Sequence, residues 1–221
     1  MNKFHLDKFP LDKFPLDKFL GGVSFAMLLL LNSGCVDLSR PALAKHYYLL
    51  ETSPKPSDGP PAHAAAIRVT GVEVSAPFSE KSLVYRLDQE RYEADFYNEY
   101  FVAPRAMITS KLVEWLTVRR VFATTLPPSS TLDAPYAIEG QVTALYGDLR
   151  DKTKTASVIG MQVFLTDTST PDKRIVLERA CSPQVPVADR TADVIAKGLS
   201  QALQQCFVQI EADLRALKLN P

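Results

Sequence analysis

Apolar and polar residues alternate along much of the chain, which predicts β-strands. The clearest alternation places Ile67 and Val69 on one face, and the pattern resumes one position late at Val72. Gly71 lies at this shift, where a β-bulge would accommodate the extra residue. We therefore expect one long strand with a bulge in this segment.

Further strands are expected on both sides of this one. A short strand over 46–50 precedes an exposed, proline-rich linker over 52–63. The same period of two marks additional strands at 83–87, 92–100, 136–146, 157–165 and 174–180.

The stretch from Tyr92 to Phe101 is rich in aromatic residues. Such a stretch is usually core, yet it can also form a surface that contacts lipid or a partner. Because alternate strand residues point to opposite faces, both interpretations can hold at once. We expect Tyr92, Phe96 and Tyr100 in the core. Tyr97 and Phe101 would then point outward.

Two segments instead repeat apolar residues at helical spacing. Pro104 opens the first helix, whose apolar face carries Ile108, Leu112, Trp115 and Leu116. The second helix is expected to begin near Ala188 or Asp189, with an apolar stripe of Ile195, Leu199, Ala202, Cys206, Ile210, Leu214 and Leu217. The elements together predict an α/β (α+β) fold, a mixed, largely antiparallel sheet with two main helices packed on it in a single domain.

Residues 1–34 have the pattern of a secretory signal. A lysine-bearing start with a short repeat precedes an uncharged stretch from Phe19 to Leu31, which at about 1.5 Å per residue is too short for a roughly 30 Å hydrocarbon core. The sequence Leu31-Asn32-Ser33-Gly34-Cys35 then resembles the lipobox of bacterial lipoproteins. That resemblance implies that Cys35 is acylated and anchors the chain to a membrane. The alternatives are a plain secreted protein or a single N-terminal anchor helix, with Cys35 an ordinary thiol.

The chain is therefore expected to have three parts. They are a lipoprotein signal peptide with a repeat-bearing extension at 1–34, a tether at 35–45 and one domain at 46–221. Val36 follows the cysteine, and the aspartate that retains enteric lipoproteins in the inner membrane is absent there. By this resemblance we expect an outer-membrane lipoprotein that faces the periplasm.

Composition and charge exclude several classes of partner. The 25 Lys and Arg residues balance 25 Asp and Glu residues, so the chain has no basic excess for a nucleic-acid backbone. Three histidines and three cysteines, widely scattered, do not form a metal-ligand pattern. We expect no nucleic acid, no metal and no cofactor.

Candidate chemistry is sparse. The sequence contains no nucleophile-elbow, phosphate-loop, zinc-protease or dinucleotide motif. His46 and His63 flank the proline-rich linker, where no packed core would position a catalytic base. Acidic pairs such as Asp148 and Asp151 are not distinguishable from solvated charges at strand ends. The sequence thus predicts no catalytic residues and a protein that is not an enzyme.

Cys181 and Cys206 remain once Cys35 is assigned to the anchor. An exported protein can form disulfides, and a bridge over this separation would contribute about 3 kcal/mol. Two ordinary buried thiols are the alternative, because spacing alone does not show that the two β-carbons meet.

The order of motifs behind the lipobox resembles the ABC-type transport auxiliary lipoprotein family, which includes the PqiC-type intermembrane transport lipoproteins. The resemblance is carried by Tyr47-Tyr48-x-Leu50, Ile67-x-Val69-x-x-Val72-x-Val74-x-x-Pro77, Val84-Tyr85-Arg86, the aromatic segment through Phe101 with Pro104, and the helix Met107 to Leu116. Family members commonly carry Trp where this chain has Phe101. The resemblance covers most of the chain after the lipobox.

The resemblance implies an accessory role in cell-envelope lipid trafficking. In such systems an ABC permease and ATPase work with a membrane-anchored MCE-domain protein, and the lipoprotein would hold the periplasm-spanning component at the outer membrane. Arg86, Tyr97 and Phe101 are the candidate partner contacts. Two alternatives stay open: an outer-membrane assembly lipoprotein that binds a β-barrel partner, and an anchored periplasmic hydrolase.

Overall fold

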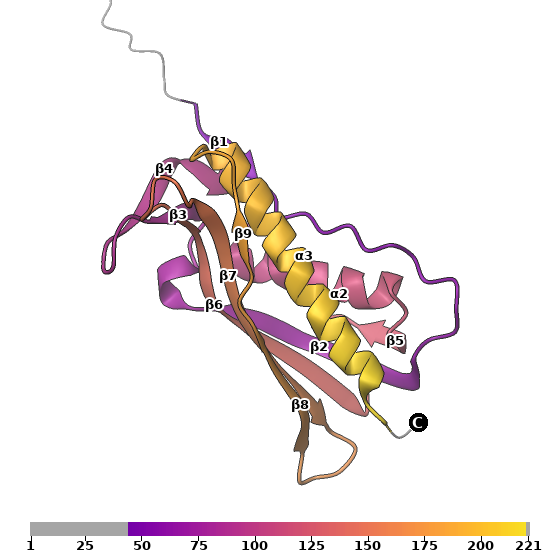
Figure 1. The fold of residues 1–221 in the computed structure, drawn as a ribbon. Helices are drawn as coiled ribbons and strands as arrows, with labels where there is room; N and C mark the ends of the chain where they lie inside the picture. The colour runs from indigo at the N-terminus through magenta and orange to yellow at the C-terminus, as the bar shows by residue number, and fades with distance from the viewer. Residues whose placement is uncertain (1–43, 220–221) are drawn as a thin grey trace, which may run out of the picture. The chain divides into compact units, whose positions relative to one another are not determined.

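The computed structural model describes residues 44–219, which form a nine-stranded sheet with two α-helices (Figure 1). The elements follow one another as β1 (His46–Tyr48), β2 (His63–Val74), the short 3-10 helix η1 (Ala76–Phe78), β3 (Ser82–Arg86), β4 (Tyr92–Tyr100), α2 (Pro104–Val118), β5 (Phe122–Leu126), β6 (Tyr136–Asp148), β7 (Ala156–Asp167), β8 (Arg174–Cys181), β9 (Gln184–Pro186) and α3 (Ala192–Ala216). Neither α-helix in this part of the chain combines the length and apolar character of a membrane span.

Strand β6 organises the sheet. Along one side it pairs in parallel with β2 and, near its end, with β3. Along the other side β7 runs antiparallel to it from end to end, and β7 in turn pairs antiparallel with β8 and β9. Beyond β3 lie β4, antiparallel, and β1, parallel to β4, whereas β5 is parallel to β2. The long ladders of β7 make the mixed sheet largely antiparallel, so the predicted fold class is confirmed.

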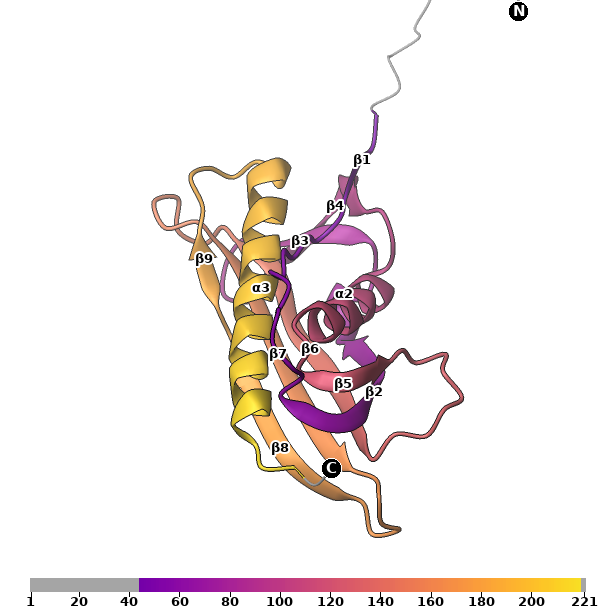
Figure 2. The same ribbon diagram turned by 90° about the vertical axis from the view of Figure 1, so that its right-hand side faces the viewer.

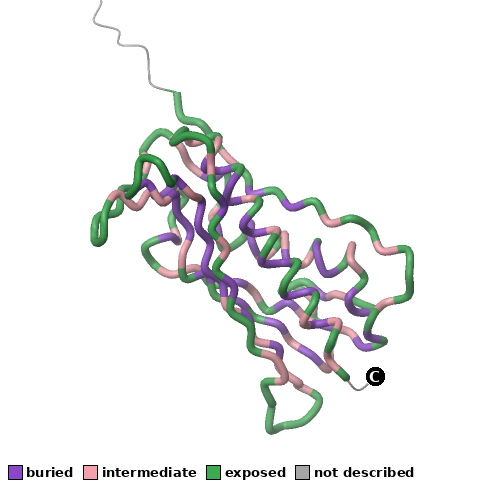
Figure 3. Tube along the Cα trace, in the orientation of Figure 1, coloured by how far each residue is buried: buried purple, intermediate pink, exposed green. Residues whose placement is uncertain are grey.

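The two helices pack through the apolar stripes that the sequence marks. Helix α3 lies along β7 and β9, and α2 lies over β2 and β5 (Figure 2). The helices meet where the rings of Trp115 and Phe207 lie 5.7 Å apart between centroids. Buried positions follow the central strands and the inner sides of both helices (Figure 3). Every predicted stripe residue of α3 is buried except Leu217, which is partly exposed.

A glycine allows α3 to approach β7 closely. A β-carbon at Gly198 would lie 2.4 Å from Ser157 Oγ and 2.7 Å from Val187 Cγ1, closer than real β-carbons come. Ser157 is fully buried on β7, and its hydroxyl donates a 2.8 Å hydrogen bond to the Ile195 carbonyl. The absence of a side chain at Gly198 therefore sets the distance between helix and sheet.

The predicted bulge in β2 is confirmed. The register against β6 shifts between Val69 and Gly71, and Gly71 has φ of 145°, a value that favours glycine.

Two short strands, β5 and β9, were not predicted from the sequence. Helix α3 begins at Ala192, later than expected, because Asp189 accepts hydrogen bonds from both the backbone and the hydroxyl of Thr191 and holds a turn before it.

The expected alternation in β4 is wrong. Tyr92 is 41% exposed and Phe96 67% exposed, and only Tyr100 lies in the core. Ala94 pairs with Val84 and the next paired residue, Glu99, is opposite Ser82, so the residues between them form a wide bulge. The Asp95 carboxylate supports this bulge by accepting hydrogen bonds from the backbone N–H groups of residues 97 and 98. The bulge interrupts the period of two on which the prediction rested.

The proline-rich segment after β1 is irregular and mostly exposed, as expected, but it is bound to the helices along its length. We call residues 51–57 the strap. The Glu51 N–H donates to Ser200 Oγ at 3.1 Å, and the Ser53 N–H donates to Gln204 Oε1 at 3.0 Å, both on α3. Further on, the Ser57 N–H reaches the Val118 carbonyl at the end of α2. The strap therefore connects the two helices, and its trace passes between α3 and α2 (Figure 2).

Candidate functional site

The predicted lipid-attachment residue, Cys35, lies outside the residues that the structure describes. Its acylation therefore remains a prediction, as do the signal peptide at 1–34 and the tether at 35–45. The described domain has a groove between its helices and an exposed aromatic patch beside β1.

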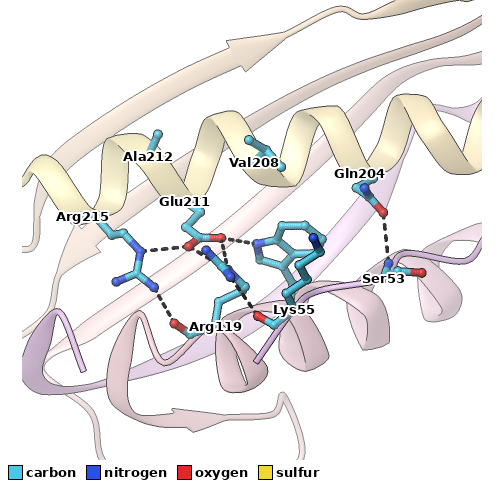
Figure 4. A pocket seen from close by; sticks show the side chains of 9 residues that line it. Ser53, Lys55, Arg119, Gln204, Val208, Glu211, Ala212 and Arg215 are labelled. Carbon is cyan, nitrogen blue, oxygen red and sulfur yellow. Dashed lines mark hydrogen bonds and ion pairs between the residues drawn. The ribbon is translucent and has the colours of Figure 1, made fainter. Parts of the chain in front are cut away.

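A groove of about 430 Å³ lies between the strap, the end of α2 and the C-terminal half of α3. We call it the Glu211 groove (Figure 4). Its lining combines apolar surface with several charged groups: Ser53, Lys55, Trp115, Arg119, Gln204, Val208, Glu211, Ala212 and Arg215. Val208 is 51% exposed, so the groove presents apolar surface to solvent.

The carboxylate of Glu211 is the centre of this groove. Trp115 Nε1 donates to Glu211 Oε2 at 2.9 Å, Arg119 Nε donates to the same oxygen at 2.9 Å, and Arg215 Nε donates to Oε1 at 2.8 Å. Arg119 also donates to the Lys55 carbonyl at 2.8 Å, and Arg215 donates to the Arg119 carbonyl. One carboxylate thus joins α2, α3 and the strap.

Electrostatics keep Glu211 ionised. Burial alone would raise the pKa of its carboxyl, but the hydrogen bonds from Arg119, Arg215 and Trp115 outweigh burial and hold the pKa below its ordinary value. A carboxylate held by two guanidinium groups is a poor base, so the groove is better suited to binding than to proton transfer. An apolar group could pack on Val208, while Trp115 lies buried beneath the groove with its Nε1 bonded to Glu211.

Sequence reasoning missed Glu211, Lys55 and Arg215 as site residues. The sequence did contain a signal for Glu211. This residue lies four residues after Phe207 and three before Leu214, within the apolar stripe of α3. A charged residue on a buried helix face needs partners, which predicts a polar cluster there. The identity of those partners depends on how α2 and the strap pack, which the helical spacing does not give.

Cys181 and Cys206, the two cysteines among the described residues, meet where α3 passes the end of β8. Cys181 Sγ and Cys206 Sγ are 1.99 Å apart, with the Cα atoms 5.7 Å apart, so the structure joins them in a disulfide. The bond connects the end of β8 to the middle of α3, and both residues are buried. Of the two possibilities that the sequence left open, the structure has the bridge.

Exposed aromatic residues gather where β1 pairs with β4. We call Tyr47, Phe96, Tyr97 and Phe101 the aromatic patch; their exposed fractions are 55%, 67%, 40% and 61%. The rings of Tyr47 and Phe101 make an edge-to-face contact with centroids 6.1 Å apart, and those of Phe96 and Tyr97 do so at 5.1 Å. Tyr97 and Phe101 point outward, as the sequence analysis expected, and they lie in one patch.

Arg86, the third predicted contact residue, is not part of this patch. It ends β3 and pairs in register with Tyr92, at the opposite end of the β3–β4 hairpin from Ser82 and Glu99. Its guanidinium donates to the carbonyls of Asp88 and Gln89 and lies 5.4 Å from the Tyr92 ring centroid. These contacts shape the hairpin turn.

The placement of His63 differs from expectation. From the sequence it was expected to lie beside the linker and outside the core, whereas the structure buries it as the first residue of β2. Its Nε2 is 2.7 Å from the Leu214 carbonyl, and its ring centroid is 4.9 Å from that of Phe122. Within residues 44–219 no three or more His, Cys, Asp or Glu side chains gather in a way that could hold a metal ion.

The fold is shared with solved structures. A Xanthomonas campestris protein of the family DUF330 superposes with a TM-score of 0.67 at 15% identity, over 75% of this chain and 92% of that chain. A second, uncharacterized protein gives 0.61 at 17% identity, over 77% and 99%. A hypothetical protein from Chlamydia trachomatis gives 0.50 at 10% identity, over 69% and 96%. At these identities the likeness concerns the fold alone.

The sequence itself identifies the family. No curated protein matches the chain. The family model described as the ABC-type transport auxiliary lipoprotein component matches residues 48–211, which span β1 to the Glu211 groove. This match covers most of the chain and agrees with the motifs noted above. The chain therefore belongs to the ABC-type transport auxiliary lipoprotein family.

Proposed function

We propose that this chain is the lipid-anchored, non-catalytic auxiliary component of an ABC/MCE-type intermembrane lipid transport system. It is fixed through Cys35 to the periplasmic side of the outer membrane, and it docks the periplasm-spanning MCE-domain partner there. The observation that carries this proposal is the family match over residues 48–211. The ABC permease and ATPase act through that partner.

The Glu211 groove is the surface that we assign to the partner. Partly exposed arginine side chains beside an exposed apolar residue, as Arg119 and Arg215 are beside Val208, are typical of protein interfaces. Trp115, Arg119 and Arg215 are held in place by Glu211, so an inserted apolar side chain would meet a preorganised surface.

The position of the groove along α3 supports this assignment. Tyr48 Oη on β1 lies 2.9 Å from Asp193 Oδ1 in the first turn of α3, so the helix starts beside the strand that follows the tether. At about 1.5 Å per residue, Glu211 lies about 27 Å further along α3 than Asp193. A domain tethered at β1 can thus present the groove away from its anchor.

Site-specific photocrosslinking in cells tests the docking. We expect p-benzoylphenylalanine in place of Val208 to form an adduct with an MCE-domain protein. Gln209, exposed on α3 but outside the groove lining, is the matched control and should give little of the same adduct. Adducts dominated by a β-barrel protein at Val208 would overturn the assignment and favour an assembly role.

Fractionation tests the anchor separately. A Cys35→Ser variant should leave the membrane fraction, and mass spectrometry of the original chain should find fatty acyl groups on Cys35. Unchanged membrane association of the variant, or an unmodified Cys35, contradicts the lipid anchor.

A further inference from the structure

We infer that the aromatic patch beside β1 is a bilayer-contact surface, which inserts the rings of Tyr47, Phe96, Tyr97 and Phe101 among the headgroups of the membrane that holds the anchor. The inference rests on the proposed attachment of lipid to Cys35. It assigns Tyr97 and Phe101 to lipid in place of the protein contact that the sequence suggested.

The patch is one continuous surface. In the parallel pairing of β1 and β4, Tyr47 lies opposite Glu99, and just after β4 the Phe101 N–H donates to the Tyr48 carbonyl at 2.8 Å. The edge-to-face contact between the Tyr47 and Phe101 rings joins the two chain segments. Lys45 Nζ lies 4.7 Å from the Phe96 ring centroid and also pairs with Glu99, which connects the β4 bulge to the rest of the patch.

The shape of the patch suits insertion into an interface. The Asp95 carboxylate fixes the β4 bulge, and the bulge carries Phe96 outward with 67% of its surface exposed. Leu49 and Val102, which follow Tyr47 and Phe101 closely in the sequence, are also exposed, by 48% and 37%. Exposed apolar groups that cluster in this way mark an interaction surface, and aromatic rings favour the headgroup region of bilayers.

Charge within the patch is balanced. Lys45 and Glu99 form an ion pair. At the edge of the patch Lys81, whose Nζ donates to the Phe101 carbonyl at 3.2 Å, is balanced by the Asp95 carboxylate of the β4 bulge. Such a surface would bind membranes through apolar burial far more than through attraction to anionic lipid. Its binding should therefore depend little on salt.

The length of the chain before β1 is the reason to assign a lipid bilayer to the aromatic patch. Ala44 is the first residue that the structure describes, and the segment from Cys35 to Ala44 extends to at most about 32 Å at 3.3–3.6 Å per residue. The patch starts three residues later, at Tyr47. An acyl group on Cys35 thus keeps the patch within a short distance of the bilayer, where even a weak affinity gives stable contact.

Depth-dependent fluorescence quenching tests the inference. The full chain, extracted from bacterial membranes with its anchor, would be reconstituted into phosphatidylethanolamine and phosphatidylglycerol vesicles that contain doxyl-labelled phosphatidylcholine. A Phe101→Trp variant reports on the patch. Ile175→Trp on β8 is the matched control, because Ile175 is 58% exposed compared with 61% for Phe101. Trp115 is the single native tryptophan and contributes equally to both variants.

We expect the doxyl lipid to quench the introduced tryptophan several-fold more strongly in Phe101→Trp than in Ile175→Trp, at low and high salt alike. Replacement of Phe96 and Tyr97 by Ser in the Phe101→Trp background should reduce this quenching towards that of the control. Equal quenching of the two tryptophan variants overturns the inference, as does a photocrosslinker at Phe101 that captures an MCE-domain or other protein in place of lipid.

The two proposals can fail separately. If mass spectrometry finds acyl groups on Cys35 and quenching at Phe101 equals the control, the patch assignment is wrong while the anchor stands. If Cys35 carries no lipid, vesicles added to the unanchored chain still measure the patch directly. Quenching of Phe101→Trp above the Ile175→Trp control would then support the patch, and its absence would refute it.

Discussion

Trp115 Nε1 donates a 2.9 Å hydrogen bond to Glu211 Oε2, and this contact joins the last turn of α2 to the C-terminal half of α3. The Glu211 side chain is 7% exposed, so its charge depends on Arg119 and Arg215 for compensation. The cluster therefore has a structural role that can be measured apart from any docking.

Replacement of Glu211 by Gln should lower the free energy of unfolding. The variant keeps the shape of the side chain but leaves two guanidinium groups without their carboxylate, at an expected loss of about 1–3 kcal/mol. Denaturant unfolding followed by Trp115 fluorescence measures this change. Glu114→Gln is the control, since Glu114 is 46% exposed in its pair with Lys111 and should contribute less than about 1 kcal/mol. Equal losses in the two variants would contradict a special role for Glu211.

The contribution of Glu211 should depend on pH. Because the pKa of its carboxyl is lowered in the folded protein from the ordinary 4.5, the stabilisation is fully present above pH 4.5 and is lost as the pH falls through the lowered value. The difference in unfolding free energy between the original chain and Glu211→Gln should thus be constant near neutral pH and shrink in acid. A difference that grows in acid would reverse the sign and refute this explanation.

The disulfide between Cys181 and Cys206 should stabilise the domain. The bonded residues are 25 positions apart, which corresponds to about 3 kcal/mol of unfolding free energy. We expect dithiothreitol to lower the melting temperature of the original chain and to leave that of the Cys181→Ser, Cys206→Ser double variant unchanged. Identical responses of both proteins to the reductant would show that the bond contributes nothing.

Replacement of Gly198 by Ala should loosen the packing of α3 on β7. The new β-carbon would collide with Ser157 Oγ and Val187, at an expected loss of about 1–3 kcal/mol, although Ala is the better helix former. Gly59→Ala is the matched control, because no heavy atom lies within 4 Å of the β-carbon that this residue would gain, and stability should hardly change. A Gly198→Ala variant more stable than the original chain would show that the helix can move at little cost.

The spacing of apolar residues predicted most of the strands and both helices, because each of these elements is marked by residues that are close together in the sequence. The bulge at Gly71 was readable because Val69 and Val72, three residues apart, are both buried, whereas a regular strand would bury residues two apart. In contrast, β5 was missed because Phe122 and Leu126 are its buried ends and the residues between them are polar or small, which gives no clear period of two.

The site was less predictable than the fold. Tyr97 and Phe101 are exposed as expected, but the regular alternation behind that expectation does not hold in β4. The exposure of Phe96 depends on a side chain, Asp95, that caps two backbone groups in place of the regular ladder. Glu211 is separated from Trp115 by nearly a hundred residues, so their contact depends on tertiary packing.

The parallel pairing of β1 with β4 has a mechanical consequence. The chain enters the domain at His46, and its register partners run from Asn98 to Tyr100 in the same direction. A pull on the preceding residues acts along β1, across the hydrogen bonds to β4, so these bonds are sheared together and do not unzip one after another. The contact of Tyr48 with Asp193 passes part of the force to α3. A strand of only three residues can thereby resist tension that its length alone would not suggest.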